Sequence, residues 1–144
     1  MAITQAMCTS FKSEILSDDA HDFLADTIKI ALYTSSATIN ATTTAYSSSN
    51  EISGSGYSSG GATLASKVVG TASTSTSGGK AYLDFDNPTW TSASFTANGA
   101  LIYNSTNSNK AIAVLAFGGD FVVAGGTFEI VLPAAGASAI IRID

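Results

Sequence analysis

From residue 27 onward the chain consists of short β-type segments that are separated by Gly, Ser, Asn and Pro. In the first segment Ile28, Ile30 and Leu32 alternate with Lys29, Ala31 and Tyr33, which is typical of a half-buried strand. Successive segments lie too close together for helical crossovers, which need about a dozen or more residues. The sequence therefore predicts a mainly β fold, an antiparallel β-sandwich or jelly-roll-like barrel with one N-terminal α-helix.

Eight or nine strands are expected, each ending at a turn signal. After the first, they cover residues 62–69, 71–76, 82–85, 99–104, 110–117, 121–124, 127–132 and 139–143, with short pieces near 43–46 and between Trp90 and Phe95. Three glycine pairs are expected to be turns: Ser77-Gly78-Gly79 of a hairpin, Gly118-Gly119-Asp120 and Gly125-Gly126. Residues 110–117 are the most hydrophobic run, and we expect a central strand that is covered on both faces.

One helix is predicted over residues 4–16. Met7, Phe11 and Ile15 recur every four positions, Thr4 is the expected N-cap, and residues 17–20 end the helix. The acidic residues that follow are expected to form a solvated connection; they are Asp18, Asp19, Asp22 and Asp26. We expect a single domain over 1–144, with a helical segment at 1–20 and a β-sandwich body at 27–144.

The composition limits the classes of partner. Of the 144 residues 45% are apolar, enough for a core, but only 12% are charged, about half the usual share. A net charge of −5 without any basic run disfavours nucleic-acid binding. We expect neither a signal peptide nor a membrane-spanning segment, and the lone Cys8 is expected to be buried.

Residues 50–57 (NEISGSGY) are the most distinctive short motif. Gly54 and Gly56 permit a sharp turn or a close approach of the backbone to a neighbour, and Tyr57 is expected to pack beside the strand that follows. A phosphate-binding role would need a helix after these glycines, which the sequence does not predict. We expect an ordered corner that anchors Ile52 and Tyr57.

The only histidine, His21, together with Asp18, Asp19 or Asp22, offers nitrogen and oxygen ligands for a metal ion. A solvated acidic connection is the favoured interpretation of this segment. One Cys and one His cannot form a structural zinc site of the usual kind.

Two carboxylates, Asp84 and Asp86, are expected to share one face of a strand, opposite Leu83 and Phe85, and therefore to face solvent rather than act as a glycosidase pair. Gly118-Gly119-Asp120 lacks calcium-loop spacing, and no G-x-S-x-G elbow occurs. The sequence thus predicts no catalytic, cofactor-binding or metal-binding residues, and no enzyme.

Four aromatic residues are candidates for a sugar-binding platform: Trp90, Tyr46, Tyr57 and Tyr103. Trp90 follows Pro88 by two positions at the start of a strand, which favours a place in the core over a role in ligand binding.

An ordered set of segments resembles a family of small tailed-bacteriophage virion proteins. The segments are residues 1–16 (MAITQAMCTSFKSEIL), 29–35 (KIALYTS), 50–57 with Gly60-Gly61-Ala62, Trp90, 98–104 (NGALIYN), 111–119 and 139–143. The resemblance implies a structural component of a virus particle, and the family motifs carry no catalytic residues.

The leading hypothesis is a capsid decoration (cement) protein, made in the host cytoplasm and located on the capsid surface of the virion. Its partners would be the major capsid protein and copies of itself, as a dimer or trimer, with no nucleic acid and no membrane. Ile3, Met7 and Phe11 are expected to serve docking or the core beneath it. A tail- or fibre-associated protein and a carbohydrate-binding module are the alternatives.

Overall fold

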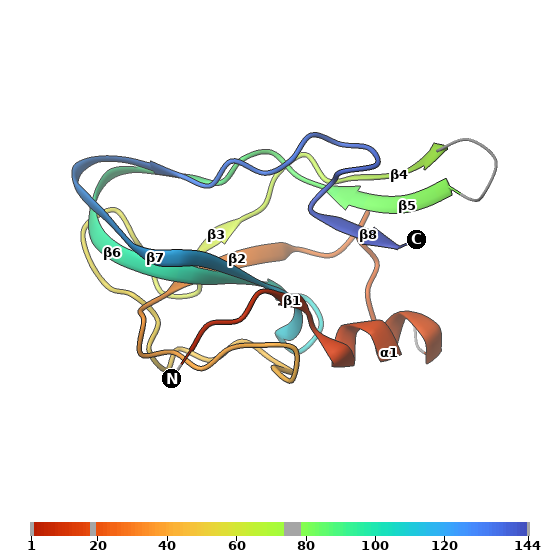
Figure 1. The fold of residues 1–144 in the computed structure, drawn as a ribbon, viewed down its shortest axis with the longest axis horizontal. Helices are drawn as coiled ribbons and strands as arrows, with labels where there is room; N and C mark the ends of the chain where they lie inside the picture. The colour runs from red at the N-terminus through yellow and green to blue at the C-terminus, as the bar shows by residue number, and fades with distance from the viewer. Residues whose placement is uncertain (1, 18–19, 74–78, 144) are drawn as a thin grey trace.

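The computed structural model describes residues 2–17, 20–73 and 79–143. They form two antiparallel sheets and one helix, which confirms the mainly β prediction (Figure 1). The strands are β1 (Ala6–Met7), β2 (Ile28–Tyr33), β3 (Ala62–Thr63), β4 (Val68–Ser73), β5 (Gly79–Asp84), β6 (Thr89–Asn104), β7 (Lys110–Glu129) and β8 (Ile141–Ile143), and the helix α1 is Thr9–Ser17. Within this part of the chain no helix is long and apolar enough to cross a membrane.

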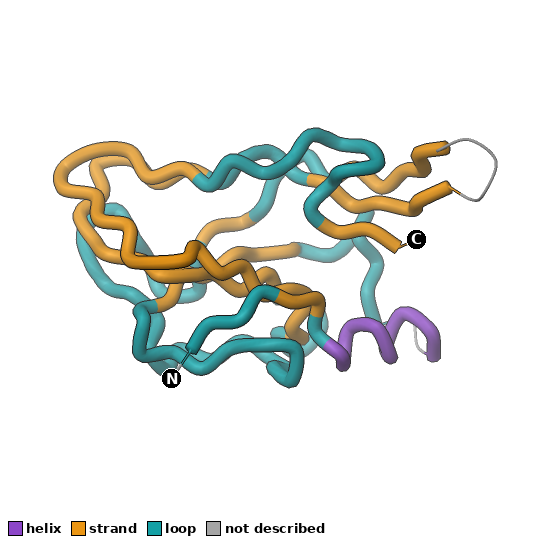
Figure 2. The backbone as a smooth tube through the Cα atoms, in the orientation of Figure 1, coloured by secondary structure: helices purple, strands orange, loops and turns teal. Residues whose placement is uncertain are grey.

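The sheets have the strand orders β1-β7-β6-β2-β3 and β4-β5-β8. They are not closed into a barrel, so the sandwich form of the prediction holds. In Figure 2 the strands form an upper and a lower layer, and the helix lies at one end beside the lower layer. The buried residues of the larger sheet include Ile30, Leu32, Leu101, Ile102 and Ile112, all inaccessible to solvent.

A long ribbon of β6 and β7 dominates the fold. The strands pair from Asn104↔Lys110 at the connecting turn to Thr89↔Glu129 at the far end. Figure 1 shows this ribbon bending back on itself, so that its two halves lie in opposite layers. Register shifts along the pairing mark β-bulges, which bend and twist a ribbon of this kind.

The predicted division of this ribbon is wrong. Gly118-Gly119-Asp120 and Gly125-Gly126 are not turns between strands but lie inside β7, and the expected strands 110–117, 121–124 and the first half of 127–132 are one strand. Gly118 and Gly125 have φ of 81° and 69°, which suits a bulge as well as a turn. The expected burial of 110–117 is confirmed for the central part of this segment, because residues 111–115 are buried.

The helix begins five residues later than predicted, and Thr4 is not its N-cap. The Thr4 N–H bonds to the Ile39 carbonyl, and β1 pairs with the edge of β7 before α1 begins at Thr9. Ile3 packs closely over Gly99, where an added Cβ would come within 2.7 Å of the Ile3 side chain. Strand pairing and this contact outweigh the helical period of the first turn.

The remaining differences lie at strand boundaries. The expected strand 62–69 is divided between β3 and β4, the final strand starts at Ile141, and residues 43–46 contribute only the bridge Ala45↔Lys110. Residues 74–78, which include the end of the expected strand 71–76 and Ser77-Gly78 of the expected hairpin turn, lie outside the described residues. On either side of them β4 and β5 pair antiparallel, with Ser73 opposite Gly79.

Candidate functional site

His21 lies in a buried polar cluster and not in a solvated connection as predicted. Its side chain is 1% exposed, with Nε2 3.3 Å from Glu14 Oε1 and Nδ1 3.1 Å from Asn104 Nδ2. The ring stacks on Phe23 at 5.7 Å and meets the edge of Phe11 at 5.1 Å. The prediction fails because the segment after α1 folds back over the ends of β6 and β7.

Charged groups complete this cluster. Lys110 Nζ donates to Glu14 Oε2 at 2.6 Å, and Asn104 Nδ2 donates to Asp26 Oδ2 at 2.7 Å. Burial opposes ionisation of Glu14, but the bonds from Lys110 and His21 outweigh it and hold its pKa below the usual value. The bond from Asn104 likewise lowers the pKa of Asp26.

We call Glu14, His21, Asp26, Asn104 and Lys110 the Glu14 cluster. It connects α1 and the following segment to the turn between β6 and β7, since Asn104 ends β6 and Lys110 begins β7. The His21 ring is shielded from solvent and both its nitrogens face protein groups, so a substrate has no access to it. The arrangement therefore holds the fold together and offers no site for acid–base chemistry.

The carboxylates near His21 do not gather around it as a metal site. Asp22 is exposed, and its Oδ1 accepts the N–H groups of Leu24 and Ala25. Asp18 and Asp19 lie outside the described residues. Across the described ranges, no three His, Cys, Asp or Glu side chains are placed to hold a metal ion.

Asp84 and Asp86 do not share a solvent-facing side, so that prediction is wrong for Asp84. Asp84 is 8% exposed and its Oδ1 has no hydrogen-bond partner among the described residues. Asp86 is exposed and accepts a 2.6 Å bond from Ser66 Oγ. Leu83, Asp84 and Phe85 are all buried, so the chain is covered on both faces where β5 ends, and the alternation of buried and exposed residues is lost there.

Glu51, within the NEISGSGY motif, is the acceptor at the centre of a second network. Its carboxylate accepts the hydroxyls of Tyr57 at 2.6 Å, Tyr46 at 2.7 Å and Ser59 at 2.9 Å, and the Gly60 N–H at 2.8 Å. Four donors thus surround one half-buried carboxylate, and we call these five residues the Glu51 network. The network fastens the long loop between β2 and β3 to itself.

The expected glycine-shaped corner is present. Gly56 has φ of 79°, and a Cβ there would lie 2.7 Å from the Thr91 carbonyl oxygen. Tyr57 packs against β2 and β6 rather than beside the strand that follows it: its hydroxyl accepts the Leu32 N–H at 2.9 Å, and its ring meets Phe95 edge-on. Ile52 is 5% exposed and belongs to the core.

The four aromatics weighed as a sugar platform do not form one exposed surface. Trp90 is 6% and Tyr103 2% exposed, which agrees with the core role expected of Trp90. Tyr57 lies beside Trp90, whereas Tyr46 stacks on Tyr103 at 4.6 Å.

The N-terminal residues expected to serve docking or the core lie mainly in the core. Phe11 is 1% exposed, and Ile3 and Met7 are half-buried and pack against the core. Cys8 is buried as predicted, and burial raises the pKa of its thiol to about 11.

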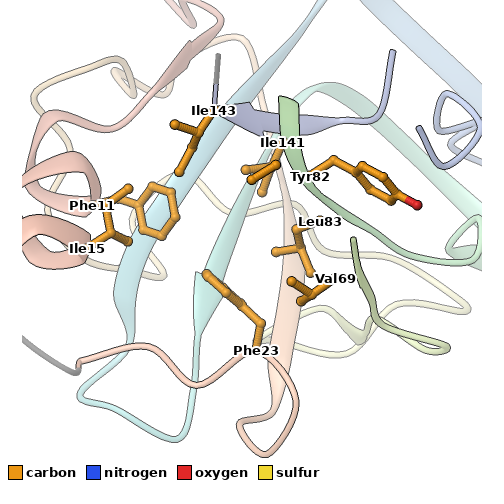
Figure 3. Close-up of a pocket in the computed structure, with 9 residues that line it drawn as sticks. Phe11, Ile15, Phe23, Val69, Tyr82, Leu83, Ile141 and Ile143 are labelled. Atoms are coloured by element: carbon orange, nitrogen blue, oxygen red, sulfur yellow. The ribbon is translucent and has the colours of Figure 1, made fainter. Parts of the chain in front are cut away.

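A small apolar pocket of about 100 Å³ lies between α1 and the three-stranded sheet. Figure 3 shows Phe11 and Ile15 from α1 facing Ile143 and Ile141 of β8, while the Tyr82 ring points away. At the rim Val69 is 52% and Ile143 48% exposed. This end of the sandwich is therefore loosely covered.

The outer part of β7 (residues 117–129), which we call the β7 arm, carries the more exposed apolar surface. Phe121 and Val122 are 53% and 73% exposed, and Val131 just beyond the arm is 73% exposed. Phe117, Phe128 and Ile130 line a groove of about 240 Å³ beside them. Such side chains bring no reactive group, and an apolar surface rimmed by polar residues is typical of contact with another macromolecule.

Comparisons of the chain with protein-family models, with curated proteins and with solved structures give no match. The geometry alone defines the class of object: an antiparallel β-sandwich with exposed apolar surfaces at its ends.

Sequence reasoning missed the Glu51 network and the burial of His21. A signal for the first was present, because Glu51 lies between Tyr46 and Tyr57 in a loop without any Lys or Arg. No comparable signal existed for His21, whose ring nitrogens contact Glu14, seven positions earlier, and Asn104, 83 positions later.

Proposed function

We propose that this chain is a structural component of a bacteriophage particle, and most specifically a capsid decoration protein. In this role many copies bind the outer capsid between major capsid subunits and stabilise the head. The observation that carries the proposal is an all-β body that leaves large apolar side chains exposed, Phe121 and Val122 at one site and Leu16 at another. A surface of this kind suits a protein that partners cover.

Composition supports the same conclusion. With 12% charged residues the surface is supplied largely by Ser, Thr, Asn and Gly, which lose less hydration free energy on contact than charges do. The net charge of −5 is unsuited to the DNA inside a head but compatible with the outer face of a capsid. The ordered segments that resemble tailed-phage virion proteins point to the same class.

The hydrogen-bond networks inside the fold suit a protein that must resist deformation. The Glu51 network ties the long loop to itself, with four donors bonding directly to one carboxylate, and the Glu14 cluster fastens the helix to the larger sheet. A cement protein must keep its shape while the shell beneath it carries internal pressure. The Glu14 cluster and the Glu51 network supply that rigidity.

The test is binding to purified capsid shells of the phage that encodes this chain, measured by co-sedimentation. We expect saturable binding that raises the temperature at which shells disrupt. Leu16→Lys and Val122→Lys each place a charge in one of the exposed apolar surfaces, and at least one should weaken binding tenfold or more. Thr42→Lys, at an exposed polar loop position, is the control. Shells that neither bind the protein nor gain stability would overturn the proposal.

A further inference from the structure

The β7 arm has an open edge. On one side β6 pairs along its length. On the other side β1 pairs only with Ala113 and Val114, and Gln5 Oε1 accepts the Ala116 N–H at 3.3 Å. Beyond this point, no segment among the described residues pairs with the second edge of the arm. In Figure 1 the blue trace of β7 forms the upper left outline of the molecule.

Part of the edge lacks the usual protection against strand pairing. Open edges are normally guarded by charges, by proline, by β-bulges or by an extra covering segment. Residues 121–127, which directly follow Asp120, include neither a charged residue nor a proline. Within this run residues 121–124 pair regularly with Ala97 through Ser94 of β6, and the bulge at Gly125 lies just beyond. The segment is therefore a short, regular strand that is ready to accept another.

We propose that the β7 arm is the self-association surface of this protein: residues 122–124 pair antiparallel with the same residues of a second copy. A twofold arrangement of this kind satisfies both open edges at once, whereas a foreign strand would satisfy only one. The Ser94 N–H bonds to the Ser55 carbonyl, so Ser94 and the opposite Ala124 point their backbone groups away from each other, and Val122 and Ala124 face the open edge. Val122 therefore lies opposite Ala124 of the second copy, and the two Val123 residues lie opposite each other. This inference rests on the proposed function to the extent that copies of the chain meet on a particle.

Charge favours this register. Asp120 lies opposite Gly126 of the second copy, and Glu129 lies beyond the regular run, so no carboxylate directly faces another. The pairing also brings apolar side chains of one copy to the groove lined by Phe117, Phe128 and Ile130 of the other. Burying Phe121 and Val122, now 53% and 73% exposed, supplies the apolar area that so short a pairing of backbones alone would lack.

The salt dependence of binding distinguishes a second copy from a basic partner. Each copy carries a net charge of −5, so screening by salt weakens their repulsion and should strengthen the dimer. A basic strand of another protein on the same edge would instead bind more weakly as salt is raised.

The test uses the full chain in sedimentation equilibrium at 50 mM and 500 mM salt. We expect a species of twice the 14.6 kDa chain mass, with a dissociation constant that falls at least threefold at the higher salt. Val122→Lys should weaken the dimer at least a hundredfold. Leu24→Lys is the matched control, because Leu24 is 74% exposed but lies in the segment before β2, and it should dimerise like the parent.

Hydrogen exchange gives the second measurement. The amides of Val122 and Ala124, which face the open edge, should become protected as the protein concentration rises, and Val122→Lys should abolish that protection. A parent chain that stays monomeric at several hundred micromolar, or a dimer without added protection in this segment, contradicts the proposal. Capsid binding is measured separately, so a monomer that still binds shells overturns only this inference, and a dimer that ignores shells overturns only the proposed function.

Discussion

Tyr57 joins the loop to the sheet through a single hydroxyl, which donates to Glu51 at 2.6 Å while it accepts the Leu32 N–H at 2.9 Å. Leu32 lies in the buried strand β2, so the hydroxyl satisfies a backbone donor that has no access to water. The loop between β2 and β3 is thereby attached to the centre of the larger sheet.

Removing this hydroxyl should destabilise the protein. Tyr57→Phe leaves the Leu32 N–H and one Glu51 oxygen short of a partner, at a cost of about 1–3 kcal/mol in the free energy of unfolding. Urea denaturation followed by fluorescence measures the difference. Tyr82→Phe is the control, since among the described residues the Tyr82 hydroxyl makes no hydrogen bond, and a change below about 0.5 kcal/mol is expected. Equal effects of the two variants would refute the role given to Tyr57.

Alanine substitutions at two glycines with similar φ distinguish the cost of a steric clash from the cost of backbone strain. Gly61 and Gly118 have φ of 76° and 81°, but a Cβ on Gly61 would lie 1.8 Å from the Ile30 carbonyl oxygen, and one on Gly118 meets nothing within 4 Å. Gly118→Ala should therefore cost only the strain of positive φ, about 1–2 kcal/mol. Gly61→Ala should cost several kcal/mol or prevent folding. Thermal unfolding of both proteins tests the difference, and similar melting temperatures would contradict it.

Alkaline pH should destabilise the fold through buried tyrosines. Burial raises the pKa of Tyr103 to about 12, and it raises the pKa of Tyr33 and Tyr57 further. Because these folded-state pKa values exceed that of an unfolded tyrosine, near 10, the neutral hydroxyls contribute their full stability below pH 10. That contribution is lost as pH rises above 10 toward the folded values. Absorbance at 295 nm should show these tyrosines ionising only together with unfolding; reversible ionisation near pH 10 in the folded protein would count against this.

Acid should act through the Glu14 cluster. The pKa values of Glu14 and Asp26 are lowered in the fold, so their stabilising effect is present above their ordinary values and is lost as pH falls through the folded values. Glu14→Gln should therefore reduce stability at pH 7 and reduce its loss between pH 6 and pH 3. Melting temperatures across this range measure both effects. A variant with the same acid profile as the parent would contradict the role of Glu14.

Cys8 should be unreactive in the folded protein. It is inaccessible to solvent, and burial, reinforced by the nearby Glu14 charge, raises its thiol pKa to about 11. At pH 8 a disulfide reagent should modify it only at the rate of unfolding, and immediately in denaturant. Fast labelling of the native protein would show that the N-terminal segment does not stay packed as described.

The fold class could be predicted because it depends on local features: short alternating segments and frequent turn residues. The division of the β6–β7 ribbon could not, because Gly118 and Gly125 permit a bulge as readily as a turn, and only pairing with β6 decides between them. The start of α1 was missed for a similar reason. Residues 4–8 have a helical period, but pairing with β7 and the fit of Ile3 over Gly99 hold them extended.

The polar interior was the least predictable part. Asp84 was expected at the surface from a period of two, which fails where Leu83, Asp84 and Phe85 are buried in succession at the end of β5. His21 was expected in solvent because its neighbours in sequence are acidic, whereas its partners in space are Glu14 of α1 and Asn104 at the end of β6. Local patterns locate strands, and contacts distant in sequence determine which polar groups are buried.

The central claim is that this chain is a decoration protein on a phage head, and its copy number per particle tests that claim most directly. Quantitative mass spectrometry of purified particles, calibrated on the major capsid protein, gives the number, and imaging of the same particles gives the position. The account predicts hundreds of copies spread over the outer shell. A handful to a few dozen copies confined to the tail, or none in the particle, would contradict it.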